Sequence, residues 1–156
     1  MNGSAAIEAF LDWKLHNKGR ARRTAEIYRH ALERLVECLG KKDLLRATRD
    51  DLVAFTGPWL AKRNIVASAR RPYVAAVRQF YAWLYMHRLL MDNPAIGVPY
   101  PKESQRLPKT MSLAQTEKLM WSPDFSTFEG VRDGAIIAIL AGCGLRVSGL
   151  VRLNES

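Results

Sequence analysis

The sequence predicts an all-α protein. Apolar residues recur at intervals of three and four along most of the chain, and no stretch alternates apolar and polar residues for long enough to indicate a strand. Proline and glycine separate these periodic stretches where helices are expected to end. The 156 residues are 48% hydrophobic and 25% charged, which is a globular composition with room for one domain or two small ones.

The first forty residues predict two helices. Ser4 is a suitable N-cap for the first helix, which is expected to end around residues 17–19. Thr24 is a suitable N-cap for the second, which Gly40 would end. The spacing directs one apolar stripe of each helix to the core: Ile7, Phe10, Leu11 and Leu15, and then Ile27, Ala31, Leu35, Cys38 and Leu39.

A third, shorter helix is predicted to begin at Thr48. Asp50 and Asp51 follow this residue, and acidic side chains are favourable in the first turn of a helix. Gly57 and Pro58 are expected to break or kink the helix, because proline donates no backbone hydrogen bond.

A fourth, longer helix is predicted with Pro72 in its first turn and residues 93–94 at its end. Its apolar face comprises Val74, Val77, Phe80, Tyr81, Leu84 and Tyr85. The opposite strip carries Arg71, Ala75, Arg78 and Ala82, so two arginines stand beside small residues that allow close approach of a partner. This strip is either a surface that contacts a DNA groove or a solvated basic face.

Four prolines between residues 94 and 108 predict an irregular segment. We interpret residues 98–111 as a linker between a first domain, 1–97, and a second, 112–156. In the second domain, Ser112 and Gln115 have the spacing of a capping box and predict a helix to about Met120. A further helix around residues 131–141 is apolar on every side and is expected to be covered all round, with Gly142 and Gly144 ending it.

The composition narrows the class of partner. Lys and Arg number 24 against 15 Asp and Glu, giving a net charge of +9 and favouring a polyanion such as nucleic acid; the alternative is a basic protein with no such role. Cys38 and Cys143 are predicted to be small core residues, with no disulfide, metal site or cofactor indicated. Neither a membrane span of about 20 apolar residues nor a signal peptide is indicated, so a cytoplasmic location is expected.

The stretch Gly144-Leu145-Arg146-Val147-Ser148-Gly149-Leu150 resembles the Gly-Leu-Arg-(Ile/Val)-Ser-Glu-Leu element of tyrosine recombinases, the phage integrase and Xer family. Further similar segments, in the family's order, are residues 7–11, Thr24 with Tyr28-Arg29, Ser68-Ala69-Arg70, Ala76-Val77-Arg78 with Phe80, Asn93-Pro94-Ala95, Leu107-Pro108-Lys109, Ser112 and Arg132-Asp133. The resemblance implies a four-helix, SAM-like core-binding domain and the start of a catalytic domain. In this family the two domains close on opposite sides of a DNA duplex, and recombination proceeds in a tetramer.

The resemblance implies that Arg146 is the first catalytic arginine, which binds the scissile phosphate. A guanidinium is suited to this role because its planar fork matches two phosphate oxygens. The family's later residues, namely a lysine, a His-x-x-Arg pair, a further His or Trp and the nucleophilic tyrosine, are not among these 156, and Gly149 replaces an acidic residue. None of Tyr28, Tyr73, Tyr81, Tyr85 and Tyr100 matches the nucleophile; Tyr73, Tyr81 and Tyr85 are predicted core aromatics.

Charge and resemblance together predict a set of DNA-binding residues. They are Arg22, Arg23, Thr24, Tyr28, Arg29, Ser68, Arg70, Arg71, Arg78, Gln79, Arg106 and Lys109. Arg71, Arg78 and Gln79 are the candidates for base edges, since arginine pairs with guanine and glutamine with adenine. Relatives often have an arginine where this chain has Pro72, so that contact is expected to shift to Arg70 or Arg71.

The leading hypothesis is a truncated tyrosine recombinase that binds double-stranded DNA at recombination sites without cutting it, and that regulates or assembles with an intact recombinase. The exposed apolar helix would then dock on the first domain, a second copy or a full-length recombinase through residues 131–153. The alternative is a helical protein-interaction module that uses the same apolar helix, with the positive charge serving only solubility.

Overall fold

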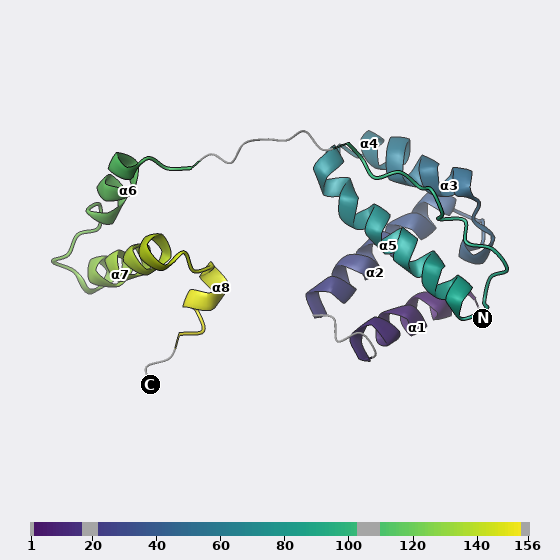
Figure 1. Cartoon of the computed structure of the whole chain (residues 1–156), viewed down its shortest axis with the longest axis horizontal. Coiled ribbons are helices and arrows are strands. Elements are labelled where there is room, and N and C mark those ends of the chain that lie inside the picture. The colour runs from purple at the N-terminus through teal and green to yellow at the C-terminus, as the bar shows by residue number, and fades with distance from the viewer. Residues whose placement is uncertain (1, 17–21, 103–109, 154–156) are drawn as a thin grey trace. The chain divides into compact units, whose positions relative to one another are not determined.

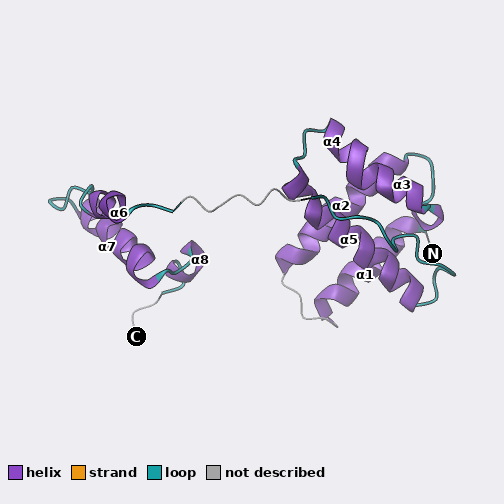
Figure 2. Cartoon of the chain, turned by 45° about the horizontal axis from the view of Figure 1, so that its top comes forward, coloured by secondary structure: helices purple, strands orange, loops and turns teal. Residues whose placement is uncertain are grey.

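The computed structural model describes residues 2–16, 22–102 and 110–153, and every regular element within these ranges is a helix (Figures 1 and 2). The predicted fold class is therefore confirmed. The chain divides into two units, Met1–Ser104 and Gln105–Ser156. The helical elements of the first unit are α1 (Gly3–His16), α2 (Arg22–Leu39), the 3-10 turn η1 (Leu44–Arg46), α3 (Arg49–Ala54), the π-helical turn η2 (Phe55–Trp59), α4 (Leu60–Lys62) and α5 (Ala67–Met86).

The first two helices begin earlier than their predicted caps. Asn2 Oδ1 accepts a hydrogen bond from Ala5 N at 2.9 Å, and α1 starts at Gly3, so Ser4 lies inside the first turn. Asparagine caps as well as serine does, which explains why the earlier residue serves. Thr24 likewise lies within the first turn of α2, which starts at Arg22, and does not cap it.

The predicted start of the third helix is confirmed. Thr48 Oγ1 accepts a hydrogen bond from Asp51 N at 3.4 Å, and Asp51 Oδ2 accepts one from Thr48 N at 2.7 Å, which together make a capping box. Of the two outcomes predicted for Gly57 and Pro58, a break or a kink, a break does not occur, and the α-helical geometry is interrupted instead. The helix widens into η2, which accommodates the missing N–H of Pro58, and continues as α4.

The fourth predicted helix is α5, and both of its ends differ from the prediction. It begins at Ala67, so Pro72 is its sixth residue, and it stops at Met86, before residues 93–94. The hydrogen bonds of the following turn, from His87 N to Trp83 O and from Leu89 N to Leu84 O, close this end without the proline.

The core of the first unit lies where α5 packs against α1, α2 and η2, and α5 crosses the middle of this unit in both views (Figures 1 and 2). The ring of Phe10 lies parallel to that of Tyr28 and edge-on to that of Phe80. Tyr81, which is fully buried, donates a hydrogen bond to Leu44 O at 2.8 Å and so ties α5 to η1.

Most of the predicted core residues are buried. Ile27 is 39% exposed and Tyr85 is 52% exposed, whereas Tyr73 is half-buried and packs against the core. The stripe of α5 is instead completed by Ala76 and Trp83, which are buried.

The second unit contains α6 (Leu113–Met120), α7 (Phe128–Cys143) and α8 (Val147–Leu150). The capping box of Ser112 and Gln115 is confirmed, and Gly144, at a φ of 62°, ends α7 as predicted. The start of α7 lies at Phe128, because Thr127 Oγ1 accepts a hydrogen bond from Gly130 N at 3.1 Å.

The predicted cover around α7 is absent from the part of the second unit that the structure describes. Only Gly130 and Gly134 are buried there, and the apolar run of the helix is half-buried or exposed. Cys143 is exposed, so its predicted place in a core is wrong, whereas Cys38 packs at the edge of the first unit's core. Within the described ranges, no helix combines the length and apolar character needed to cross a membrane.

Candidate nucleic-acid interface

The first turn of α2 presents basic side chains to solvent. Arg22 and Arg23 are exposed, and Thr24 is partly covered. Arg23 forms an ion pair with Glu26 at 3.2 Å, in which the side chains remain 82% and 64% exposed. An exposed pair of this kind contributes little to stability, so a DNA phosphate can compete for Arg23 at small cost.

Arg29 is held by a carboxylate. Both of its terminal guanidinium nitrogens donate to the carboxylate of Glu8 on α1, with Arg29 Nη2 2.7 Å from Glu8 Oε2. The hydrogen bond from Arg29 holds the pKa of Glu8 below its ordinary value. Arg29 therefore joins α1 to α2, and a DNA contact by this side chain would have to share or break that bidentate pair.

Tyr28 and Gln79 are joined to each other and to a buried lysine. Gln79 Nε2 donates to Tyr28 Oη at 2.9 Å, and Gln79 Oε1 accepts a hydrogen bond from Lys14 Nζ. The Lys14 side chain is buried beneath the rings of Phe10, Trp13 and Tyr28. The amide of Gln79 uses both of its ends in this network, which directs it away from the role of reading an adenine edge.

Sequence reasoning missed Lys14, although its position gave a signal. It lies three and seven residues after Leu11 and Ile7, and thus on the apolar stripe of α1. A lysine on such a stripe either extends its amine past the core or finds polar and aromatic partners inside it, and here it does the latter.

Arg70 fastens the start of α5 to the rest of the unit. Its Nε atom donates to Ile65 O at 2.7 Å, and its Nη1 atom donates to Gly57 O at 3.4 Å. Ser68 is exposed in the first turn of the same helix. Of the two arginines to which the family's contact was expected to shift, Arg70 is thus engaged with backbone carbonyls and Arg71 is exposed.

Arg71 and Arg78 lie on the outer strip of α5, as predicted from their spacing. Both are exposed, and Ala75 and Ala82 share the strip with them. The central guanidinium carbons of Arg71 and Arg78 lie 5.5 and 5.2 Å from the centre of the Tyr100 ring. The structure thus brings these two predicted residues together around an aromatic side chain that sequence reasoning had not assigned.

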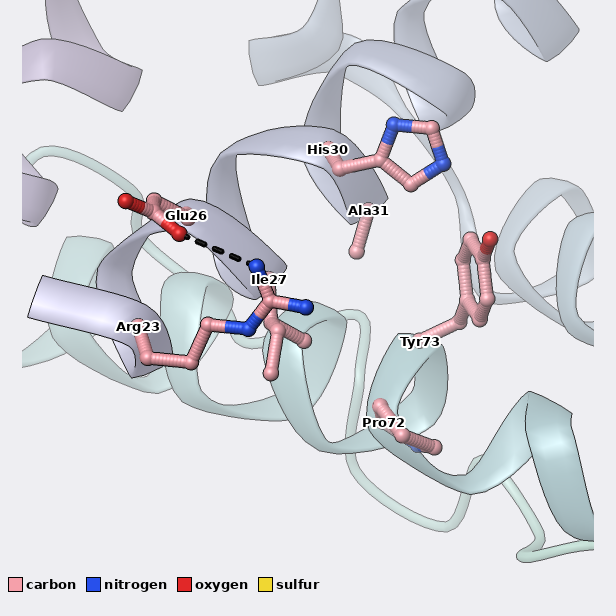
Figure 3. Close-up of a pocket in the computed structure, with 7 residues that line it drawn as sticks. All are labelled: Arg23, Glu26, Ile27, His30, Ala31, Pro72 and Tyr73. Atoms are coloured by element: carbon pink, nitrogen blue, oxygen red, sulfur yellow. Dashed lines mark hydrogen bonds and ion pairs between the residues drawn. The ribbon is translucent and has the colours of Figure 1, made fainter. Parts of the chain in front are cut away.

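A groove of about 320 Å³ lies between α2 and α5, and Arg23 of α2 is among the residues that line it (Figure 3). Its lining is mainly apolar, and it explains the exposure of Ile27, which faces the groove together with Ala31 and Pro72. The rings of His30 and Tyr73 meet at its far side, with centroids 6.1 Å apart. Apolar groups of both helices therefore face this groove, with Arg23 and Glu26 of α2 beside them.

Three predicted residues lie elsewhere. Arg106 and Lys109 fall outside the described residues. Arg146 belongs to the second unit, where it is exposed at the N-cap of α8 and its carbonyl oxygen accepts hydrogen bonds from Gly149 N and Leu150 N. The exposed guanidinium of Arg146 is chemically suited to bind an anion, because it is permanently charged and has several N–H donors.

Comparison with known proteins identifies relatives of almost the whole chain. The family model described as "Phage integrase, N-terminal SAM-like domain" matches residues 7–88. The tyrosine recombinase XerD of Yersinia pestis is 37% identical over 152 residues, covering 96% of this chain and 50% of the relative. XerD of Vibrio cholerae is 32% identical over 153 residues, covering 95% of this chain and 49% of the relative.

A solved structure agrees on the fold. The integrase from mycobacterium phage Brujita has a TM-score of 0.57 and 24% identity, covering 91% of this chain and 46% of that protein. The chain spans about half the length of the curated relatives it matches. Because the family model covers more than half of the 156 residues, the chain belongs to the tyrosine recombinase family, and its first unit carries the family's SAM-like N-terminal domain.

Proposed function

We propose that this protein binds double-stranded DNA at recombination sites through the face of its first unit formed by α2 and α5. The observation that carries the proposal is the outer strip of α5, where Arg71 and Arg78 are exposed beside alanines. An α-helix fits into the major groove of DNA, and small residues beside the arginines let its backbone approach the base edges. Arg22 and Arg23, which are exposed in the first turn of α2, are proposed to contact phosphates.

The contacts inside the first unit refine the set of DNA-binding residues. Arg71 and Arg78 are proposed for base edges, and Arg22, Arg23, Thr24 and Ser68 for the backbone. Arg29, Arg70, Tyr28 and Gln79 are proposed to support this surface from behind, because each is engaged with a partner on a neighbouring element. Arg106 and Lys109 remain proposed phosphate contacts of the linker, residues 98–111.

Residues 112–156 are proposed to be the start of a catalytic domain, with Arg146 in the role of the phosphate-binding arginine. They contain no tyrosine, and Gly149 stands where relatives carry an acidic residue. A polypeptide of these 156 residues is therefore proposed to bind DNA without cutting it, and to regulate or assemble with an intact recombinase.

A salt-titrated binding experiment tests the DNA proposal. Fluorescence anisotropy of a labelled 30-base-pair duplex, with the full chain titrated at several salt concentrations, is expected to give an affinity that falls steeply with salt. The double variant Arg71→Ala/Arg78→Ala is expected to bind at least about tenfold more weakly, since a good arginine–base pair contributes roughly 1–3 kcal/mol.

The matched control is Lys41→Ala/Arg46→Ala, which removes the same charge. Both residues are exposed at or beside η1, which contacts α5 through the buried Tyr81 and not through the outer strip. This variant is expected to retain most of the affinity. Equal losses of affinity in the two double variants would mean that net charge, and not the outer strip of α5, determines binding. No binding of any duplex at low salt would refute the proposal.

A second function is favoured by the exposure of α7. Phe128 and Val131 are 79% and 52% exposed in its first turns, and large apolar side chains in such positions commonly mark an interaction surface. The candidate is a protein-interaction module that acts through residues 131–153, together with the neighbouring Phe128, on a second copy or a full-length recombinase. Light scattering coupled to size-exclusion chromatography tests self-association. A molecular mass that rises with protein concentration, and that returns to the monomer mass in Phe128→Lys/Val131→Lys, supports the interaction module. A monomer at every concentration argues against self-association.

A further inference from the structure

Tyr100 stands on a short segment that the first unit holds in place. Val98 and Ala95 are buried in the core, and Val98 N donates a hydrogen bond to Ala95 O at 3.3 Å. Gly97, between them, has a φ of 74°, a conformation that favours glycine. Pro99 and Pro101 flank Tyr100 and, with it, line a hollow beside Thr56 and Gly57, so the backbone that presents the ring has little freedom.

The ring of Tyr100 lies between two arginines of the same helix strip. Arg71 and Arg78 are seven residues apart, which is two turns or about 10.5 Å along an α-helix. Each guanidinium carbon lies within 5.5 Å of the ring centre. At these distances a guanidinium is attracted to the face of a tyrosine ring, so the single ring restrains both cations.

The arrangement leaves the arginines usable. A guanidinium has five N–H donors that point outward in its plane, so a contact with one ring leaves donors available for DNA. Tyr100 is itself 43% exposed, and both arginines are exposed, so solvent reaches the side chains on either side of the ring. An unrestrained arginine loses rotamer freedom when it binds DNA, and a side chain that is already ordered avoids much of that cost.

We propose that Tyr100 is a positioning residue for DNA recognition. Its ring restrains the side chains of Arg71 and Arg78, so that both are ordered before α5 meets the major groove of DNA. This inference rests on the proposed function of α5. It also gives the linker segment that follows the first domain an indirect part in recognition, since this segment supplies the ring that orders the two arginines.

The test compares two substitutions in the full chain. Tyr100→Ala is expected to weaken binding of the labelled duplex by about five- to twentyfold, because both arginines must then lose rotamer freedom when they bind. Tyr100→Phe keeps the ring face and is expected to bind within about twofold of the unsubstituted chain. Thermal unfolding of each variant checks that the first unit remains folded.

The same substitution in the Arg71→Ala/Arg78→Ala background separates positioning from other roles, and there Tyr100→Ala is expected to change nothing further. Three outcomes would overturn the proposal. Tighter binding by Tyr100→Ala would mean that the ring masks the arginines. An equal loss in Tyr100→Phe would mean that the hydroxyl acts, and an undiminished loss in the double-arginine background would mean that the ring contacts DNA directly.

A measurement without DNA distinguishes this inference from the proposed function. Relaxation of the arginine ¹⁵Nε nuclei is expected to show ordered Arg71 and Arg78 side chains in the unsubstituted chain and in Tyr100→Phe, and mobile ones in Tyr100→Ala. If no duplex binds but this pattern is found, the DNA function fails while the restraint by Tyr100 stands. If the two arginines are equally mobile in all three proteins, the positioning role is refuted whatever the DNA result.

Discussion

Lys14 carries a positive charge into the core of the first unit. Its Nζ atom lies 5.4 to 5.7 Å from the ring centres of Phe10, Trp13 and Tyr28, and it donates a hydrogen bond to Gln79 Oε1. Burying an ammonium group is costly unless oxygen atoms or ring faces replace its water. Gln79 is therefore a structural partner of Lys14 and, through Tyr28, a tie between α5 and α2.

Gln79→Ala is expected to lower the free energy of unfolding by roughly 1–3 kcal/mol, because it leaves buried polar groups with fewer partners. Gln79→Glu is the matched control, since a carboxylate accepts from both Lys14 Nζ and the Tyr28 hydroxyl and should preserve the network. Urea denaturation measures both. If Gln79→Ala unfolds like the unsubstituted chain but loses affinity for DNA, Gln79 belongs to the interface after all.

Asp51 gives the first unit a predictable dependence on pH. A hydrogen bond from Lys42, and then one from the backbone of Thr48, lower the pKa of this carboxyl group. Because the pKa is lower in the folded chain, the stabilisation is present above the unfolded pKa of about 4 and is lost as the pH falls through the folded value. Stability should therefore decline below about pH 4, and less so in Asp51→Asn.

The comparison of urea denaturation at pH 7, 4 and 3 isolates this contribution. Asp50→Asn, in the exposed neighbouring position of the same helix turn, is the control and should leave the decline as steep as in the unsubstituted chain. If the free energy of unfolding falls with pH as steeply in Asp51→Asn as in the unsubstituted chain, Asp51 is not the source of the pH dependence.

At the level of elements, α5 is extended through a proline. Pro72 is the sixth residue of the helix, where a proline removes the hydrogen bond to the carbonyl of Ser68 and crowds it. Pro72→Ala is expected to raise the free energy of unfolding by roughly 1–3 kcal/mol, measured by urea denaturation. Pro94→Ala, in the turn where Ala95 N donates to Asn93 Oδ1, is the control and should be neutral or slightly destabilising.

An unchanged or lower stability of Pro72→Ala would mean that the apolar contacts of the proline ring in the groove between α2 and α5 stabilise the first unit at least as much as the missing backbone hydrogen bond would. Pro72 lines this groove with Ile27 and Ala31, so the two effects oppose each other at one residue.

Elements with a local start signal were predictable from the sequence. Thr48 and Ser112 cap helices through residues three positions later, and both predictions are confirmed. The α5 start carries no side-chain cap, as Val66 precedes it, and the prediction instead used the proline five residues inside the helix. That is why the start was placed too late.

The candidate site was predictable only in part, for a related reason. Periodicity placed Arg71 and Arg78 on an outer strip, and they lie there. The partners of Gln79 and Arg70 lie 51 and 13 residues away in the sequence, so no local pattern revealed that these side chains are engaged inside the unit. The approach of Tyr100 to α5 likewise depends on the course of the chain after Met86.

At the scale of the whole molecule, the two units differ in what holds them together. All large buried apolar side chains of the described ranges belong to the first unit, and in the second only Gly130 and Gly134 are buried. A helix of 16 residues such as α7 is marginally stable in water without a packed face. The two units are therefore expected to differ sharply in stability.

Hydrogen exchange read by mass spectrometry should resolve this difference along one chain. Amides of α5 are expected to exchange only when the first unit unfolds, whereas amides of α7 should exchange orders of magnitude faster through local opening. Raising the protein concentration is the internal control: if α7 associates with a second copy, its protection should rise with concentration while that of α5 stays constant. Protection of α7 equal to that of α5 in a dilute monomer would show that the second unit is stable without a large buried core, and the interaction role proposed for residues 131–153 would lose its physical basis.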